Sequence, residues 1–138
     1  MDTLCGPLNG GAFLAELIAA ELAVEFAFAE RIVSQRTGLF PIDYRVPAAL
    51  RAALRGKRVA VVDDAISMGS AIRATVADLE LCKAKPVVIG ALLAIGPGGP
   101  EFAAARRLPF ERLAQVPMRT WIPSECQLCA SGVAVADP

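Results

Sequence analysis

The chain has 138 residues, with 14 basic and 14 acidic side chains and no histidine, so its formal net charge is zero. This length fits one domain with a single hydrophobic core. The hydrophobic fraction of 55% and the mean hydropathy of +0.50 are high for a monomer in water. We therefore expect part of the surface to meet a second copy of the chain in a homodimer.

The sequence pattern favours neither a membrane span nor an exported, disulfide-linked framework. The longest charge-free stretch near a predicted strand, Pro86 to Pro100, contains four glycines and is shorter than the ~20 apolar residues that cross a bilayer. The opening Met1-Asp2-Thr3 lacks the basic region of a signal peptide. With four cysteines and no export signal, we expect a reduced, cytoplasmic protein.

The first predicted unit is a strand, a glycine-rich turn and a helix. Residues 1–5 supply the end of a strand, and residues 6–11 (Gly-Pro-Leu-Asn-Gly-Gly) form a turn with exposed amides and little side-chain bulk. Apolar residues then recur at helical spacing and predict a helix from about Ala12 to Ala23. Alternation of apolar and small residues predicts a second strand from Val24 to Ile32.

The stretch between Val33 and Pro47 is predicted to be a long loop, because it has no sustained period and contains Gly38 and Pro41. Pro47 is expected to open a short helix that runs to about Leu54.

Seven of the 14 basic residues lie between Arg31 and Arg58, against the single acid Asp43. Such a concentration favours an anionic partner. For Arg51 and Arg55, which are four residues apart, a solvated helix face explains the charge equally well.

The organising stretch is Val59 to Val62, four apolar residues followed by Asp63 and Asp64. It is too short for a helix and rich in β-branched residues, which is typical of a strand buried on both faces of a parallel sheet. Ligands of such sheets bind outside the carboxyl ends of the strands, where the two acids are expected. Residues 67–70 (Ser-Met-Gly-Ser) then lead into a helix, whose first amides form an anion site. One ligand that carries hydroxyl groups and a phosphate would bind the two acids and the anion site at the same time.

The remaining pattern continues the alternation of strands and helices. It predicts a helix over 70–82, a strand over 87–95, a glycine-rich loop over 96–99, a short helix over 100–107 and an edge strand over 111–116. This repeated order predicts an α/β protein with a three-layer parallel sheet flanked by helices.

The tail carries the paired cysteines Cys126 and Cys129. One Cys-x-x-Cys pair in a chain without histidine supplies two of the four ligands of a structural zinc. Zinc bound within one chain is therefore not expected. Structural or incidental cysteines are favoured, and a metal shared across a dimer is the alternative.

Residues 61–71 (Val-Val-Asp-Asp-Ala-Ile-Ser-Met-Gly-Ser-Ala) resemble the phosphoribosyl-pyrophosphate (PRPP) signature of the type I phosphoribosyltransferases. Met68 and Ser70 depart from the residues common there, but both changes keep the backbone amides. The resemblance implies that Asp63 and Asp64 hold the ribose hydroxyls and are catalytic. It also implies that the following loop binds the 5-phosphate, through Ala65, Ser67, Met68, Gly69, Ser70 and Ala71.

The glycine turn at residues 6–11 resembles the pyrophosphate-binding loop of the same family, in its glycines and in its place upstream of the acids. The resemblance implies that Pro7, Leu8, Asn9 and Gly10 bind pyrophosphate. The loop over 34–45 stands where the family carries a mobile lid, so Arg36 and Arg45 are expected to meet pyrophosphate charge, with Arg36 catalytic. The alternative is a surface loop with ordinary arginines. Magnesium (Mg²⁺) is expected to be held mainly by the diphosphate.

The implied reaction is transfer of a ribosyl group from PRPP to a nitrogenous base, orotate-like or other. The tail, with Trp121, Pro123 and Glu125 before Cys126 and Cys129, is similar to endings in an orotate phosphoribosyltransferase-like branch. Family members carry a hood before the pyrophosphate loop, whereas five residues precede Gly6 here. We therefore expect a single core domain, truncated at its N-terminus and without a hood. The alternative function is an inactive PRPP-binding regulator that binds RNA through the basic stretch, although nucleic acid is the less expected partner.

Overall fold

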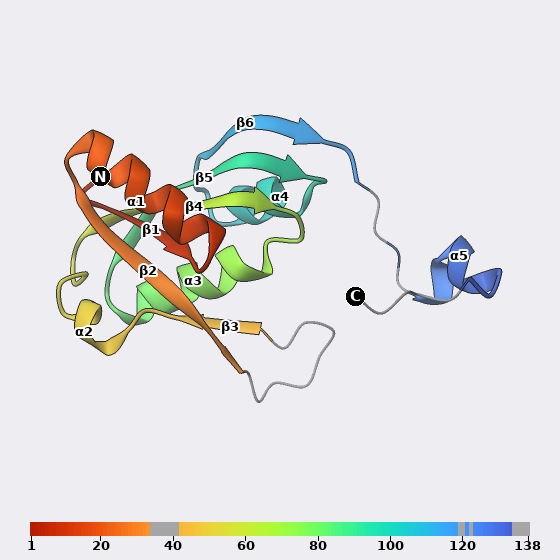
Figure 1. The fold of residues 1–138 in the computed structure, drawn as a ribbon, viewed down its shortest axis with the longest axis horizontal. Coiled ribbons are helices and arrows are strands. Elements are labelled where there is room, and N and C mark those ends of the chain that lie inside the picture. The colour runs from red at the N-terminus through yellow and green to blue at the C-terminus, as the bar shows by residue number, and fades with distance from the viewer. Residues whose placement is uncertain (34–41, 119–120, 122, 134–138) are drawn as a thin grey trace.

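The computed structural model describes the chain except for residues 34–41, 119–120, 122 and 134–138. Strands and helices alternate along most of it (Figure 1). The elements are β1 (Thr3–Pro7), α1 (Gly10–Leu22), β2 (Glu25–Val33), β3 (Ile42–Arg45), α2 (Ala48–Arg51), β4 (Arg58–Ile66), α3 (Ser70–Leu81), β5 (Lys85–Ile95), α4 (Gly98–Ala105), β6 (Phe110–Val116), the 3₁₀ turn η1 (Pro123–Glu125) and α5 (Gln127–Ala130).

Six strands form one sheet in the order β3-β2-β1-β4-β5-β6. β1 lies between β2 and β4, with Cys5 opposite Ala27 on one side and Val61 on the other. All neighbours are parallel except β2 and β3, which are antiparallel. The predicted α/β class is therefore confirmed, and β6 lies at the edge of the sheet as predicted.

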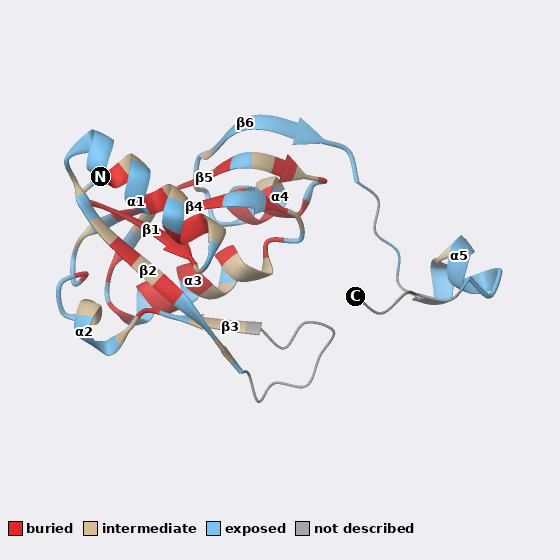
Figure 2. Ribbon diagram, in the orientation of Figure 1, coloured by how far each residue is buried: buried red, intermediate tan, exposed pale blue. Residues whose placement is uncertain are grey.

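The helices cover both faces of the sheet and make three layers (Figures 1 and 2). Successive residues of β4 point to opposite faces, so that Val59 and Val61 pack in the larger core with α3 and α4. Ala60 and Val62 pack in the smaller core under α1. Because both faces are covered, the strand is apolar at every position from 59 to 62, as a buried parallel strand requires.

The predicted end of the strand at Val62 is wrong. β4 continues to Ile66, so Asp63 and Asp64 belong to the strand. The reason is β5, which pairs Asp63 with Ala91 and Ile66 with Ala94. A partner strand of this length can hold polar residues in extended conformation, which local apolarity does not reveal.

The predicted loop between Val33 and Pro47 is also partly wrong, because β2 reaches Val33 and residues 42–45 form β3. β3 pairs with the end of β2, Arg31 opposite Tyr44. Four residues are too few to show the alternation that predicts a strand, so β3 can be recognised only from its pairing with β2.

The helix expected from Pro47 to Leu54 is shorter than predicted, since α2 ends at Arg51. Asp78 of α3 ties this region to the core. Its Oδ2 accepts the backbone N–H of Val46 at 2.8 Å and pairs with Arg51 at 2.6 Å. Within the described residues, no helix is long and apolar enough to cross a membrane.

Candidate functional site

Two loops from different parts of the chain meet at the carboxyl edge of the sheet. The turn after β1 lies directly against the two acids of β4. A Cβ atom at Gly10 would stand 2.3 Å from Asp64 Oδ2, and one at Gly11 would stand 2.6 Å from Asp63 Oδ1. A Cβ at Gly11 would also stand 2.8 Å from the backbone carbonyl oxygen of Val62, so the start of α1 can approach Asp63 this closely only with glycine there.

The turn after β1 is held by backbone hydrogen bonds. The N–H of Leu8 donates to the carbonyl of Ala29 at 2.8 Å, and the hydroxyl of Tyr44 donates to the carbonyl of Leu8 at 3.3 Å. The Leu8–Asn9 peptide bond is cis. The residues predicted to bind pyrophosphate, Pro7 to Gly10, therefore form one supported loop beside the acids.

Asp63 is buried, with 8% of its surface exposed. Burial, followed by hydrogen bonding to Asp64 and the charge of Asp64, raises the pKa of Asp63 from 3.8 to about 7. Backbone N–H groups of Asp64 and Gly11 oppose the rise, because they donate to the carboxylate. Asp63 therefore changes its charge near neutral pH.

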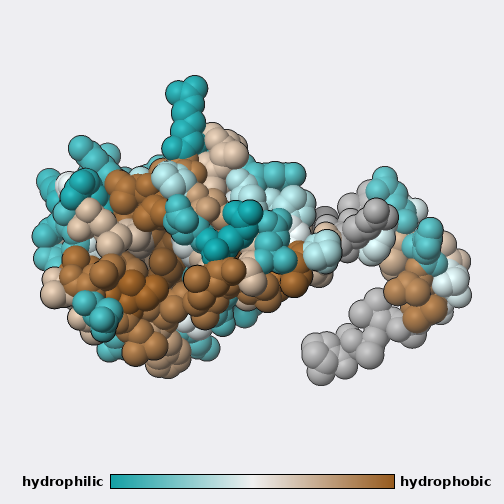
Figure 3. All heavy atoms as spheres, turned by 90° about the horizontal axis from the view of Figure 1, so that it is seen from above, coloured by the Kyte–Doolittle hydropathy of each residue, from teal (hydrophilic) through white to brown (hydrophobic). Residues whose placement is uncertain are grey.

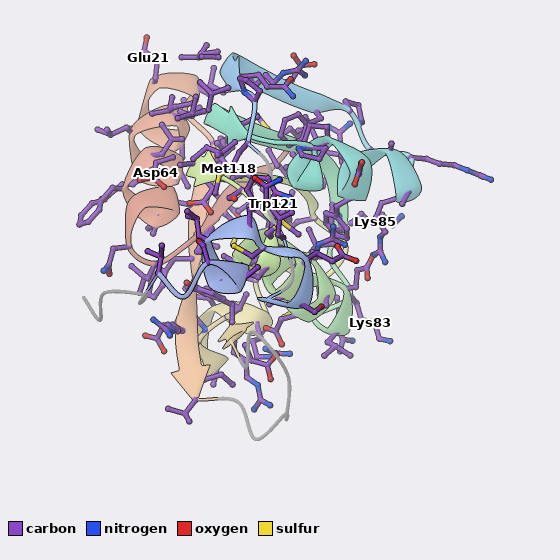
Figure 4. The ribbon with its side chains drawn as sticks, turned by 90° about the vertical axis from the view of Figure 1, so that its right-hand side faces the viewer. Glu21, Asp64, Lys83, Lys85, Met118 and Trp121 are labelled. Atoms are coloured by element: carbon purple, nitrogen blue, oxygen red, sulfur yellow. The ribbon has the colours of Figure 1, made fainter. Side chains whose placement is uncertain are left out.

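Asp64 is exposed and faces the solvent at the edge of the sheet (Figure 4). Its Oδ1 accepts the backbone N–H of Ala65 at 2.8 Å, which orients the carboxylate. One acid is thus buried and its neighbour is open to a ligand.

The predicted 5-phosphate loop joins β4 to α3. Gly69 precedes the helix with a φ of 74°, a left-handed conformation that favours glycine. The loop surrounds a hollow of about 180 Å³, lined by Asp63, Ala65, Ile66, Ser67, Met68, Gly69, Ser70, Ala71 and Ile72. α3 begins at this hollow, and the first N–H groups of a helix attract an anion there.

The predicted 5-phosphate loop is braced by Arg73 of α3 and by the first residue of α4, Gly98. Arg73 donates to the carbonyls of Met68 and Gly98, each at 3.3 Å, and its guanidinium lies 4.5 Å from the ring centre of Phe102. A Cβ at Gly98 would stand 2.7 Å from the carbonyl oxygen of Ser67. The loop and the start of α4 therefore pack backbone against backbone.

A second hollow, of about 330 Å³, adjoins the phosphate loop and shares Ser67 and Met68 with it. Met118 and Trp121 close its outer side at the same edge of the sheet as Asp64 (Figure 4). Ile95, Gly96, Pro97, Gly98 and Glu101 complete its lining.

The structure brings together the predicted acids, the glycine turn and the 5-phosphate loop. Arg36 lies outside the described residues. Arg45 lies opposite Glu30 in the pairing of β3 with β2, so its side chain leaves β3 on the face opposite Tyr44. The roles of both arginines in binding pyrophosphate remain predictions.

Sequence reasoning missed two supporting residues. The sequence pattern places Tyr44 in a loop and gives Gly98 no role beyond that of a loop glycine. The partner of each is distant in the sequence, and the Gly96-Pro97-Gly98-Gly99 cluster was the available signal for the second.

An open, mostly parallel sheet with two acids and a helix start at the carboxyl end of a central strand defines an α/β protein of the kind that binds its ligand outside the carboxyl ends of the strands. The profile of the phosphoribosyl transferase domain matches residues 1–107, and the chain belongs to this family.

Relatives and solved structures agree with this assignment. The chain is 27% identical over 141 residues to an orotate phosphoribosyltransferase of Thermotoga maritima, covering 100% of this chain and 67% of the relative. It is 30% identical over 140 residues to an orotate phosphoribosyltransferase of Carboxydothermus hydrogenoformans, covering 99% and 65%. The chain therefore spans about two thirds of the length of these relatives.

Two solved structures show the same fold. One is an adenine phosphoribosyl transferase from Trypanosoma brucei, in complex with AMP, pyrophosphate and ribose-5-phosphate. It has a TM-score of 0.69 and 22% identity, covering 83% of this chain and 56% of that one. The other is an orotate phosphoribosyltransferase from Aeropyrum pernix, with a TM-score of 0.62 and 20% identity, covering 83% and 60%.

Proposed function

We propose that the protein transfers ribose 5-phosphate from PRPP to a nitrogenous base and releases pyrophosphate. The observation that carries this proposal is the position of Asp63 and Asp64 between a glycine turn and an anion cradle. In the reaction, the bond from the ribose C1 to pyrophosphate breaks, a bond from C1 to a base nitrogen forms, and the base nitrogen loses its proton. The protein supplies orientation and charge, since no nucleophilic side chain is needed.

Each part of the site has a role in this proposal. The carboxylate of Asp64 accepts hydrogen bonds from the ribose hydroxyls, with Asp63 beside it. The amides and hydroxyls from Ser67 to Ala71 bind the 5-phosphate. The turn from Pro7 to Gly10 binds pyrophosphate, and Arg36 and Arg45 are further candidates for that charge.

Mg²⁺ fits the donors present, although they do not form a complete cage. In the part of the chain that the structure describes, no group of three or more cysteine, aspartate and glutamate side chains is arranged to hold a metal. Two carboxylates alone suit Mg²⁺, which keeps several waters and takes substrate phosphate oxygens as ligands. We therefore propose that Asp63 or Asp64 meets an ion held mainly by the diphosphate.

We place the base in the hollow beside the phosphate loop. Its position next to the 5-phosphate cradle and its lining by Met118 and Trp121 suit a flat heterocycle. The relatives are orotate phosphoribosyltransferases, so orotate is the first base to test. Trp121 is the only tryptophan of the chain, and quenching of its fluorescence by a base would report occupancy.

We also propose a cytoplasmic homodimer. Apolar side chains gather on the face that carries α1 and β6 (Figure 3). Leu17 and Leu113 are 71% and 84% exposed, and an apolar groove of about 460 Å³ runs between α1 and β6. A second copy would cover this surface, and light scattering at micromolar concentration measures the assembly.

The central test is PRPP binding. PRPP with Mg²⁺ should raise the melting temperature of the full chain, because it binds only the folded state. Asp64→Asn should weaken binding about 10- to 100-fold, since one charge-assisted hydrogen bond contributes roughly 1.5–3 kcal/mol. Glu16→Gln, which removes an exposed charge on α1, is the matched control and should bind as the native protein does. No shift at millimolar PRPP would contradict the proposal.

Turnover is tested separately with PRPP and a panel of bases that includes orotate and adenine. Release of pyrophosphate with one of them supports the transferase. Binding of PRPP without turnover on any base favours the regulatory alternative, and a salt-dependent RNA shift would then test its RNA-binding form.

A further inference from the structure

The paired cysteines of the tail are not used by the proposed transfer reaction. Cys126 and Cys129 lie in a compact turn of residues 126–133, here called the cysteine turn, which stands apart from the sheet in Figure 1. Cys129 is exposed and Cys126 is partly exposed, whereas Cys5 and Cys82 are buried. The tail therefore presents two accessible thiols side by side.

Backbone hydrogen bonds close the cysteine turn. The carbonyl of Cys126 accepts the N–H of Ala130 at 2.9 Å. Gly132, with a φ of 73°, bends the chain, and its N–H donates to the carbonyl of Cys129 at 3.1 Å. Cys126 and Cys129 therefore lie on one hydrogen-bonded helical turn.

This arrangement has the features of half a metal site. The Cys-x-x-Cys spacing is that of structural zinc sites. Residues three apart on one helical turn are neighbours, so the two thiols can bind the same ion.

The other half of such a site cannot come from cysteine or histidine of the same chain. The sequence contains no histidine and four cysteines. Cys5 and Cys82 belong to the hydrophobic core between the sheet and α3. Among the residues that the structure describes, no cluster of three or more cysteine, aspartate and glutamate side chains could hold a metal. A full set of four thiolate ligands therefore requires a second molecule with the same turn.

We propose that Cys126 and Cys129 form half of a zinc site, which the same two cysteines of a second copy of this chain complete. Four thiolates at about 2.3 Å would surround Zn²⁺ in a tetrahedron, the closed geometry of structural zinc. Four thiols bind one Zn²⁺ as four thiolates, so binding releases the protons still present on them. The site would link two tails and is independent of PRPP binding.

The experiment uses the full chain, purified with a phosphine reductant and without chelators, then dialysed against Zn²⁺ and freed of excess ion. Metal analysis should find one zinc for every two chains. Cys126→Ser and Cys129→Ser should each reduce zinc to background. Cys82→Ala, which removes a cysteine outside the turn, is the matched control and should keep the native zinc content. Thermal unfolding checks that all variants fold.

Replacement of Zn²⁺ by Co²⁺ identifies the ligands. The proposal expects the visible bands of a tetrahedral ion and a thiolate charge-transfer band of four-sulfur intensity, both lost in the two serine variants. It is overturned by one metal per chain with a two-sulfur spectrum, by a reduced protein that binds no zinc, or by zinc that stays in the serine variants. An intrachain disulfide in place of metal, in protein kept under the reductant, would also overturn it.

Discussion

Replacing Asp63 with asparagine should stabilise the folded protein at pH 8 while it weakens PRPP binding. Asp63 is buried beside Asp64, and its pKa is raised from 3.8 to about 7. The folded protein therefore binds more protons than the unfolded chain between these two values. Its stability falls as the pH rises through this interval and stays low above it. The asparagine side chain would carry no charge, and its amide would donate toward Asp64 where protonated Asp63 does.

The magnitude follows from the size of the shift. A difference of about 3 pKa units, at 1.36 kcal/mol per unit, corresponds to about 4 kcal/mol at pH 8. At pH 5 the native protein has lost only the stability that corresponds to the interval from pH 3.8 to pH 5. The difference in the free energy of unfolding between the variant and the native protein should therefore grow by about 2–3 kcal/mol from pH 5 to pH 8. Part of the native stability is thus given up to keep a buried acid at this edge of the sheet.

Urea denaturation of the native protein and of Asp63→Asn at pH 5 and pH 8 measures this difference. Glu16→Gln, which removes an exposed acid from α1, is the control, and its effect should stay within about 0.5 kcal/mol at both pH values. Equal differences between Asp63→Asn and the native protein at pH 5 and pH 8 would show that Asp63 does not carry the shift.

Two further changes test the supports of the site. Gly98→Ala should destabilise the protein by about 1–3 kcal/mol and weaken PRPP binding, because the new methyl group would stand 2.7 Å from the carbonyl oxygen of Ser67 and displace the phosphate loop. Asp78→Ala should cost about 1–3 kcal/mol without a direct effect on the ligand site, since it leaves the N–H of Val46 and the guanidinium of Arg51 without their shared acceptor. Urea denaturation and PRPP titration measure both.

Each of these changes has a control in the same protein. Gly90→Ala brings a methyl group to 3.2 Å from a side-chain atom of Val62, and a side chain can move more easily than a backbone, so it should cost less than Gly98→Ala. Lys57→Ala breaks an exposed pair with Glu25 and should cost less than about 1 kcal/mol. If a control variant lowers the free energy of unfolding as much as the variant it is paired with, the contact removed in that variant does not explain the loss of stability.

The arrangement of the two acids, the glycine turn and the helix start could be predicted because its signals are local. Four apolar residues before Asp63 and Asp64 indicate a buried strand that ends at a ligand, and the small residues that follow indicate a helix start. The glycine turn is equally visible, since glycine tolerates conformations and close approaches that other residues do not. These features need only neighbours along the chain.

The tertiary structure decided what depends on distant partners. β3 exists because the end of β2 pairs with it, and Tyr44 reaches the carbonyl of Leu8, 36 residues away in the sequence. The pKa of Asp63 rises because packing removes water from the carboxyl group. The amino-acid sequence by itself determined which groups the protein can offer to a ligand. Only folding determined which of them are buried, braced or brought together, because burial and contact depend on residues that are far apart in the chain.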